Sequence, residues 1–342
     1  MNNDWKQYLQ TNVTPGSDES TGYKKTDNSS VICDLSQFST LVVAGDDAAT
    51  FMQGQFTNDV DKVDENHSQL SAICNNKGRM IANFRLFKHQ QNYFLNLNSE
   101  LTEKTIQHLQ NYILRAHVAI QEISEQLIHI GISGADASEL LSPFIENINQ
   151  DIDSISHNDN YIVIRVADAN EKPRYEIFCS LEHAKTLWEK ISEQAEVVHF
   201  TTWNYLNIQA GIPFIDAATS EEFVPQMVNM ELINGVSFTK GCFTGQEIIA
   251  RTHYLGKQKR RTYHIKITSD TEPKAGDQLA TDTSTDNQYT GTLVTVLPTA
   301  INEYEALAVI QIKSAEEDRL KLKHTDAKIS FLDLPYSLEE SE

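Results

Sequence analysis

Residues 240–247 read Lys-Gly-Cys-Phe-Thr-Gly-Gln-Glu, the most unusual stretch of this 342-residue chain. Gly241 and Gly245 bracket Cys242 directly ahead of an apparent helix that continues to Arg251. A thiol beside a lysine and near a helix N-terminus has two reasons to ionise easily, the adjacent cation and the positive end of the helix dipole. The loop is therefore a candidate site for a nucleophile, a redox-sensitive thiol, a metal contact or a bound anion. The plainer alternative is a tight turn in which Cys242 is merely small.

The surrounding sequence assigns no partner to this thiol. Glu247 and Arg251 stand one turn apart and favour pairing on the helix. No histidine or carboxylate is placed by spacing to act as a base for Cys242. The chain contains no Walker loop, no Gly-x-Gly-x-x-Gly and no His-Glu-x-x-His, and its histidines are scattered. The sequence therefore gives no recognisable catalytic set and no metal site.

Charge is distributed unevenly along the chain. With 28 Lys and Arg against 48 Asp and Glu, the net charge is −20, which argues against a general nucleic-acid binder. Residues 240–266 nevertheless carry seven Lys and Arg against one acid, and residues 66–99 carry four against none. These two basic islands suggest a localised anion site, and the alternative is two solvated faces.

Length and composition limit the class of protein. A chain of 342 residues with 40% hydrophobic and 22% charged residues is typical of a soluble protein of two or three domains. Apolar runs such as 127–132 are too short to span a bilayer, and residues 1–6 show no secretory signal, so we expect a cytoplasmic protein. Cys33, Cys74 and Cys179 lie beside apolar residues and read as small buried hydrophobes.

The pattern of apolar residues predicts a mixed α+β fold with antiparallel sheet. Residues 1–30 read as a polar, partly disordered leader with a short helix near 5–9, and the ordered part is expected to begin at Val31. A strand at 41–44 and a helix at 47–53 capped by Asp46 come first, and from the hairpin at 80–97 to Ile191 the order is β-β-α-β-α-β-β-α, ending in a helix capped by Ser180. Beyond Lys257 only strands are expected, as in a small barrel or sandwich.

A family resemblance rests on five segments in order. The stretch 240–247 resembles the signature of the YgfZ-type folate-binding proteins, relatives of the glycine-cleavage T-protein, an aminomethyltransferase. The other four segments are Gly45-Asp46-Asp47 leading to Gln53-Gly54-Gln55, then Lys77-Gly78-Arg79-Met80, then Asn207-Ile208-Gln209-Ala210-Gly211-Ile212-Pro213, and finally residues 334–340 from Leu334. The resemblance covers nearly everything from Val31 onward.

This resemblance implies a three-lobed fold with a central folate channel and a C-terminal β-barrel. The first lobe would comprise 31–100 plus about 196–256, the second about 101–195, and the barrel 257–342. Proteins of this type support iron–sulfur cluster assembly or repair in client enzymes, notably those that modify tRNA by thiomethylation. The resemblance therefore implies a folate-dependent accessory protein whose cofactor is tetrahydrofolate or another folate derivative.

The resemblance also implies site residues. Trp203 and Phe38, the latter where relatives often carry Trp, would flank the folate ring, with ordinary core packing as the plainer alternative. Lys240 would meet the glutamate tail of folate and act with the reactive thiol of Cys242. The motif residues around them are Gly241, Gly245, Gln246, Glu247 and Arg251.

Two further readings stay open. Aminomethyltransferases carry an acid pair where this chain has Ala82 and Asn83, so the T-protein reaction is not expected. A folate-dependent one-carbon transferase that uses Cys242 is one alternative. Direct tRNA contact is the other, through the basic cluster Lys257, Lys259, Arg260 and Arg261, which reads equally as an exposed linker.

Overall fold

The computed structural model describes residues 2–12, 29–281, 289–316, 320–323, 325 and 327–338. The chain divides into two compact units. The first comprises Met1–Ala49, Asp61–Gln69 and Arg85–Leu206, and the second comprises Thr50–Val60, Leu70–Phe84 and Asn207–Glu342. The three lobes expected from the sequence have boundaries that differ from those of these two units, and the three-lobe division stays a prediction.

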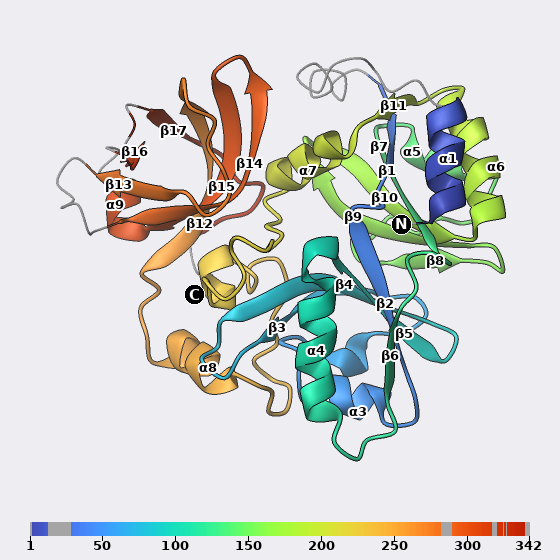
Figure 1. Cartoon of the computed structure of the whole chain (residues 1–342), viewed down its shortest axis with the longest axis horizontal. Helices are drawn as coiled ribbons and strands as arrows, with labels where there is room; N and C mark the ends of the chain where they lie inside the picture. Colours follow the sequence, from blue (N-terminus) through green and yellow to red (C-terminus); the bar gives the residue numbers. More distant parts are fainter. Residues whose placement is uncertain are drawn as a thin grey trace. The chain divides into compact units, whose positions relative to one another are not determined.

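A six-stranded sheet forms one half of the first unit (Figure 1). Its strands follow the order β11 (Glu196–Val198), β1 (Val31–Asp34), β7 (Ile128–Ser133), β10 (Lys172–Cys179), β9 (Tyr161–Ala169) and β8 (Ile155–His157). Neighbouring strands are antiparallel, except that β1 and β11 run parallel. Helices α5 (Ala137–Leu141) and α6 (Leu181–Ser192) supply apolar side chains to the core of this sheet.

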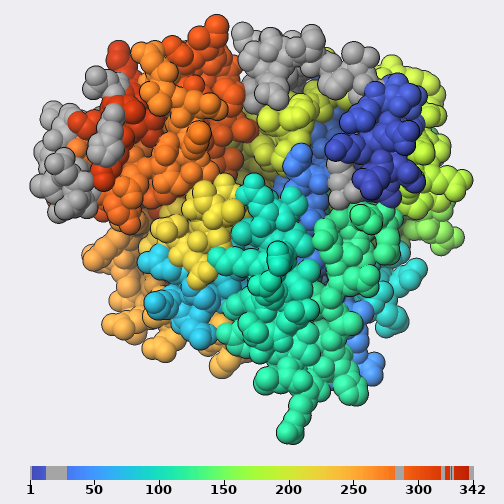
Figure 2. Space-filling view, viewed as in Figure 1, coloured from blue at the N-terminus to red at the C-terminus, as the bar shows by residue number. Residues whose placement is uncertain are grey.

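The N-terminal helix α1 (Asn3–Asn12) belongs to the same core. Trp5 is 0% exposed, meets Trp188 edge to face at 5.4 Å between ring centroids, and donates from Nε1 to Asp34 Oδ1 at 2.8 Å. Figure 2 shows the outer side of α1, in dark blue, at the surface. The folded chain therefore starts well before Val31, contrary to the sequence-based expectation, while residues 13–28 of the expected leader lie outside the described residues.

A second sheet region in the first unit centres on β2 (Phe38–Ala44), which pairs antiparallel with both β5 (Asn92–Asn98) and β6 (Ala119–Glu122). β4 (Met80–His89) precedes β5, which confirms the predicted hairpin at 80–97. The helices here are α3 (Ala48–Gln53) and α4 (Thr102–Ile113).

The second unit contains β3 (Gln69–Cys74) from Leu70 onward, the first half of β4, and the strands after residue 257. These later strands form a sheet in the order β16 (Leu320–Leu322), β13 (Gln278–Thr281), β14 (Gly291–Ala300), β15 (Glu303–Gln311), β12 (Arg260–Thr268) and β17 (Lys328–Leu332). The edge strands β16 and β17 also contact each other, so the sheet is nearly closed like a barrel. The short helix α9 (Ile312–Glu316) packs on β15.

Two helices lead to the residues of interest. α7 (Phe200–Gln209) carries Trp203, and α8 (Gln246–Tyr254) follows the Cys242 loop. Within the part of the chain that the structure describes, no helix combines the length and the apolar character needed to cross a membrane.

Candidate functional site

Two glycines hold the Cys242 loop against a turn far away in the sequence. Gly245 has φ +83°, and a β-carbon on it would lie 2.5 Å from the Asn75 carbonyl oxygen and 2.9 Å from Gly78 Cα. Gly78 has φ +69°, and its β-carbon would lie 3.0 Å from Ile248 Cβ. Only glycine suits a positive φ combined with so close a backbone approach. The Lys77-Gly78-Arg79 and cysteine motifs are therefore one packed structure.

Asn75 shapes the turn on which this loop rests. Its Oδ1 accepts hydrogen bonds from the backbone N–H groups of Lys77 at 2.9 Å and Arg79 at 3.1 Å. Its Nδ2 donates to Glu221 Oε2 at 2.7 Å. The sequence analysis did not single out Asn75, although asparagine at a turn beside glycine is a recognisable signal.

The third motif, at Gln53-Gly54-Gln55, contacts the loop from another side. The Thr244 N–H donates to the Gly54 carbonyl oxygen at 3.2 Å, and Thr244 Oγ1 donates to Gln55 Oε1 at 3.1 Å. The Phe243 N–H donates to Gln246 Oε1 at 2.8 Å, so the first residue of α8 also holds the loop. Three of the five motifs thus meet around Cys242.

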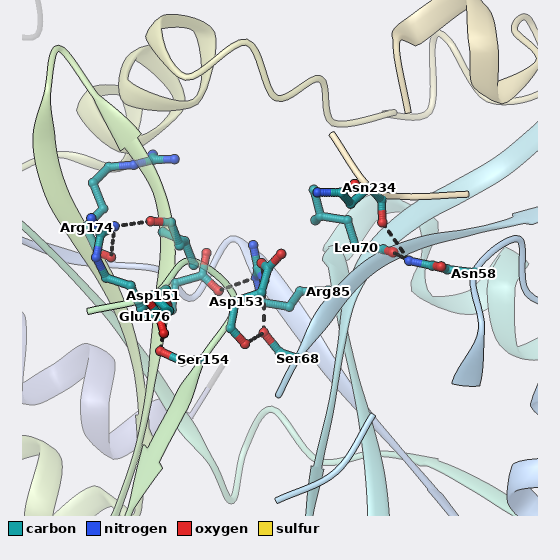
Figure 3. A network of polar contacts seen from close by, with 12 residues as sticks. Asn58, Ser68, Leu70, Arg85, Asp151, Asp153, Ser154, Arg174, Glu176 and Asn234 are labelled. Atoms are coloured by element: carbon teal, nitrogen blue, oxygen red, sulfur yellow. Dashed lines mark hydrogen bonds and ion pairs between the residues drawn. The ribbon is translucent and has the colours of Figure 1, made fainter. Parts of the chain in front are cut away.

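Lys240 anchors the start of the loop. Its Nζ donates to the carbonyl oxygens of Phe56 at 2.6 Å and Asn58 at 2.9 Å, and lies 5.1 Å from the centroid of the Phe243 ring. Asn58 is itself fixed, because its Nδ2 donates to the carbonyl oxygens of Leu70 at 2.9 Å and Asn234 at 2.7 Å (Figure 3). These contacts give Lys240 a structural role, and its contact with a ligand anion stays a prediction.

Cys242 is the exposed thiol among the four cysteines, all of which are free. Burial raises the pKa of the Cys33 and Cys74 thiols well above their usual value and that of Cys179 to about 12. Cys242 opens onto a pocket of about 810 Å³ beside α8. The pocket is lined by Asn76, Cys242, Phe243, Gly245, Gln246, Glu247, Ala250, Arg251, Tyr254 and Leu255.

Asn83 occupies a place where the side chain must both donate and accept a hydrogen bond. It is buried, its Nδ2 donates to the Pro213 carbonyl oxygen at 2.7 Å, and its Oδ1 accepts from the Ile215 N–H at 2.8 Å. An ionised carboxylate has no proton for the Pro213 carbonyl. The amide side chain is therefore part of the fold and carries no exchangeable acid.

The remaining two motifs meet in the second unit. Tyr336 donates its O–H to the Gly211 carbonyl oxygen at 2.7 Å, and a β-carbon on Gly211 would lie 2.6 Å from Tyr336 Cε1. Asn229 Nδ2 donates to Tyr336 Oη at 3.4 Å, and burial raises the pKa of Tyr336 to about 12. Residues 339 and 340 of the last motif lie outside the described residues.

The basic cluster after α8 is only partly exposed. Lys257 and Lys259 are exposed, and Arg260 lies with Cζ 5.3 Å from the centroid of the Tyr289 ring. Arg261 is 4% exposed and forms an ion pair with Glu231, so the prediction that Arg261 contacts tRNA at the surface is wrong. The sequence-based expectation failed because Glu231 lies thirty residues upstream and no local pattern links the two.

Trp203 lies in the first unit and is 1% exposed. The guanidinium carbon of Arg174 lies 5.1 Å from the centroid of its ring, and a β-carbon on Gly131 would lie 2.7 Å from Trp203 Cζ3. The indole Nε1 is buried without a hydrogen-bond partner among the described residues. Phe38 is also buried in this unit, 5.9 Å from the ring centroid of His129 and 5.4 Å from that of Phe200.

A cluster of buried charges lies beside these aromatics, and the sequence analysis missed it. Glu176 Oε2 lies 3.6 Å from His129 Nε2 and 3.8 Å from Arg85 Nε. Burial alone would raise the pKa of Glu176, but His129, Arg85 and Arg174 together hold it below its usual value. Arg85 also contacts Asp153 Oδ1 at 2.5 Å and Ser68 Oγ at 3.0 Å (Figure 3).

Arg174 is fully buried, and this desolvation lowers its pKa to about 9. Its Nε donates to the Ala167 carbonyl oxygen at 2.8 Å. The sequence signal is the pair Arg174 and Glu176 inside an otherwise apolar strand, since buried ions are rare unless they are paired. Among the described residues, no group of three or more His, Cys, Asp or Glu could hold a metal ion.

Comparison with known families identifies the chain at family level. The model of the GCVT N-terminal domain matches residues 19–237. The chain belongs to the GCVT family. This membership confirms the relation to the glycine-cleavage T-protein that the five motifs indicated.

Relatives of this GCVT chain agree along nearly their whole length. It is 28% identical over 319 residues to a tRNA-modifying protein YgfZ from Pectobacterium atrosepticum, covering 93% of this chain and 95% of that protein. It is 29% identical over 310 residues to the protein of the same name from Yersinia pseudotuberculosis, covering 90% and 93%. The resemblance to the YgfZ type is therefore confirmed.

The fold of this GCVT chain has a solved counterpart. The glycine cleavage system aminomethyltransferase T from Bartonella henselae superposes with a TM-score of 0.74 at 14% identity, covering 96% of each chain. That likeness, with the antiparallel sheets and the nearly closed C-terminal sheet, confirms the predicted α+β fold of the T-protein type.

Proposed function

We propose that this protein is a folate-binding accessory factor in tRNA modification, which supports iron–sulfur enzymes through the Cys242 loop. The observation that carries the proposal is the assembly of three motifs around one exposed thiol, in a chain whose full-length relatives are named tRNA-modifying proteins. A loop fixed by two glycines, a lysine and several backbone hydrogen bonds presents the thiol in a defined position. Such pre-organisation is what a binding or transfer site requires.

Two features of the residues around Trp203 support a folate site. A pterin ring offers both hydrogen-bond donors and acceptors, and folate ends in carboxylates. Trp203 Nε1 is a buried donor without a hydrogen-bond partner among the described residues, and the buried carboxylate of Glu176, which His129 and Arg85 approach at 3.6 Å and 3.8 Å, is an acceptor. A buried polar atom left unpaired costs about 1–3 kcal/mol, so a ligand that satisfies it binds with a corresponding gain. Trp203, Phe38 and Glu176, all in the first unit, are the residues we expect to hold the ring.

Cys242 is the group we expect to act on the client. An exposed thiol in an open pocket can contact an iron–sulfur cluster, a persulfide or a client thiol. Iron–sulfur enzymes that thiomethylate tRNA are the expected clients. This step is proposed from the exposure of Cys242 and from the resemblance to the YgfZ type.

A one-carbon transferase is the less favoured alternative. Ala82 is a buried methyl group, and Asn83 is engaged on both sides of its amide, so neither position offers an acid for chemistry at a folate nitrogen. A methylated or formylated Cys242, seen by mass spectrometry after incubation with the matching folate, would revive this reading.

Calorimetric titration of the purified protein with tetrahydrofolate and 5-formyltetrahydrofolate tests the folate part. We expect binding that Glu176→Gln weakens at least tenfold, whereas Glu182→Gln, at an exposed residue of α6, leaves it unchanged. Trp203→Phe keeps a ring but removes the unpaired N–H, and we expect intermediate loss. Absence of binding to either folate, in protein that circular dichroism shows to be folded, would reject the folate role.

Restoration of tRNA thiomethylation in a deletion strain tests the thiol part. Cys242→Ala is expected to fail while retaining folate binding, and Cys33→Ala serves as the control for loss of a thiol elsewhere. Full restoration by Cys242→Ala would remove the thiol from the mechanism and leave the binding role standing.

A further inference from the structure

The end of α8 and the segment after it combine cations with an exposed aromatic ring. Between Ala250 and Arg260 the chain carries four Lys and Arg and no acid, in a protein of net charge −20. Arg251, Lys257 and Lys259 are exposed. Tyr254, between them in the sequence, is 64% exposed although it is a large aromatic residue. Exposed aromatics interleaved with cations are typical of surfaces that bind single-stranded nucleic acid.

Tyr254 is held in place despite its exposure. Its hydroxyl donates to the Phe238 carbonyl oxygen at 3.4 Å. Its ring lies edge to face against His253, with centroids 4.7 Å apart, and His253 in turn stacks on Phe238 at 3.7 Å. Because the contacts are at the edge and at the hydroxyl, the ring is oriented while most of its surface stays open to a stacking partner.

The pocket beside this ring is large enough to admit a base. Its volume of about 810 Å³ falls within the range of small-ligand sites, and Phe243, Arg251 and Tyr254 are among its lining residues. Glu247 lines it as well, and a carboxylate accepts hydrogen bonds from the exocyclic amino group of a base. Cys242 lies on the wall of the same pocket.

A second basic element packs against the cysteine loop. Lys77 and Arg79 are exposed on the turn that packs against Gly245 through Gly78. Lys77 and Arg79 of the basic island 66–99 therefore lie in the second unit, at the loop that carries Cys242. Phosphates on a strand crossing this region would find cations along its path.

We propose that this pocket binds an unstacked base of single-stranded RNA, which stacks on Tyr254 while Arg251, Lys257 and Lys259 hold the adjoining phosphates. The site places the nucleotide next to the Cys242 thiol. This inference rests on the proposed function, because it names the RNA partner of the same loop. Positive charge alone would attract an acidic protein segment as well as RNA. The oriented ring of Tyr254 is what favours RNA, and the experiment below distinguishes the two partners.

Fluorescence anisotropy with a labelled RNA hairpin carrying an unpaired loop tests the site, with a blunt duplex of the same length as the comparison. We expect the hairpin to bind about tenfold more tightly than the duplex, because only an unpaired base can stack in the pocket. Tyr254→Ala is expected to weaken hairpin binding about tenfold, and Tyr254→Phe, which keeps the ring, is expected to preserve it.

Charge reversal gives an independent measurement. Replacing Lys257 and Lys259 together by Glu is expected to weaken binding and to flatten its salt dependence by about two units of slope, since about one unit is lost per phosphate contact. Lys274→Glu, at an exposed lysine far along the sequence, is the matched control and is expected to change neither. Equal binding of hairpin and duplex, with no effect of Tyr254→Ala, would overturn the proposal.

An acidic peptide distinguishes the protein alternative. Competition by polyglutamate as strong as that by the unlabelled hairpin would show a general anion or protein surface and would overturn the RNA assignment. Folate titration of the same samples keeps the two proposals apart. If the wild-type protein binds folate but does not bind the hairpin, only this inference is rejected. If the wild-type protein binds the hairpin but binds neither folate, only the folate role is rejected.

Discussion

The backbone of Gly245 passes so close to Asn75 that a β-carbon on it would lie 2.5 Å from the Asn75 carbonyl oxygen. Asn75 belongs to the turn after β3, and Gly245 precedes α8. The contact therefore joins two segments about 170 residues apart and fixes the start of the helix that follows the exposed thiol. The position of Cys242 depends on a contact that a single methyl group would disrupt.

Gly245→Ala is expected to destabilise the protein by about 2–4 kcal/mol, because alanine is strained at φ +83° and its methyl group meets backbone atoms that cannot turn aside. Thermal unfolding measures the change. Gly241→Ala is the matched control, since a β-carbon there meets nothing within 4 Å and we expect a change within about 0.5 kcal/mol. Equal stability of the two variants would show that the loop relaxes freely.

Alkylation of the native protein is expected to modify Cys242 alone. Cys33, Cys74 and Cys179 are buried, while Cys242 is exposed. Mass spectrometry after brief iodoacetamide treatment should therefore show one modified cysteine in the native protein and four in denaturant. Cys242→Ser should show none in the native state, and labelling of a second cysteine under native conditions would contradict the burial of the other three.

Asn83→Asp is expected to destabilise the protein by about 2–4 kcal/mol at pH 7, because a buried carboxylate cannot donate to the Pro213 carbonyl oxygen. Burial without a cation would raise the pKa of the new carboxyl group in the folded state. The protonated form can donate, so the loss should shrink as the pH falls toward the ordinary Asp pKa of about 4. Urea unfolding at pH 7 and pH 4 measures this; Asn160→Asp, at an exposed asparagine, is the control. A pH-independent loss would contradict the explanation.

Glu176 makes the opposite prediction for acid stability. Its pKa is held below the ordinary glutamate value of 4.5 in the folded state, so the folded protein binds fewer protons there than the unfolded chain. Its contribution to stability is complete above about pH 4.5 and is lost as the pH falls through the folded pKa. Glu176→Gln should therefore lower the melting temperature at pH 7 and make it less sensitive to acid below pH 4.5. Parallel pH profiles for the two proteins would contradict this.

Local patterns were sufficient for the long elements. The Ser180 cap and the apolar spacing after it located α6, and alternation located the hairpin of β4 and β5. The short strands β1 and β11 were not recognised as a pair, because three or four residues show too little alternation. The short helix predicted near residues 5–9 is confirmed by α1, but its packing into the core was not predictable because the burial of Trp5 depends on Trp188, far along the chain.

The site was only partly predictable for the same reason. Spacing and resemblance located Cys242 and its glycines, but the meeting of Gly78 with Gly245 requires the three-dimensional fold. Arg174 and Glu176 stand in one short strand, whereas Arg85 and His129 come from two others, so their pairing leaves no periodic signal. Charge clusters formed between strands of two different sheets are invisible to any analysis of neighbours along the sequence.

The interleaving of the two units along the chain has a consequence during synthesis. Residues 50–60 and 70–84 belong to a unit whose remaining part begins at residue 207. At about 5–20 residues per second, a ribosome takes on the order of ten seconds to make the intervening chain. Throughout that time the residues that bury Phe56 and Phe84 in the finished protein have not all been synthesised, so these two side chains lack part of their core. The nascent chain thus carries a period of exposure to aggregation or chaperone capture that follows from its topology alone.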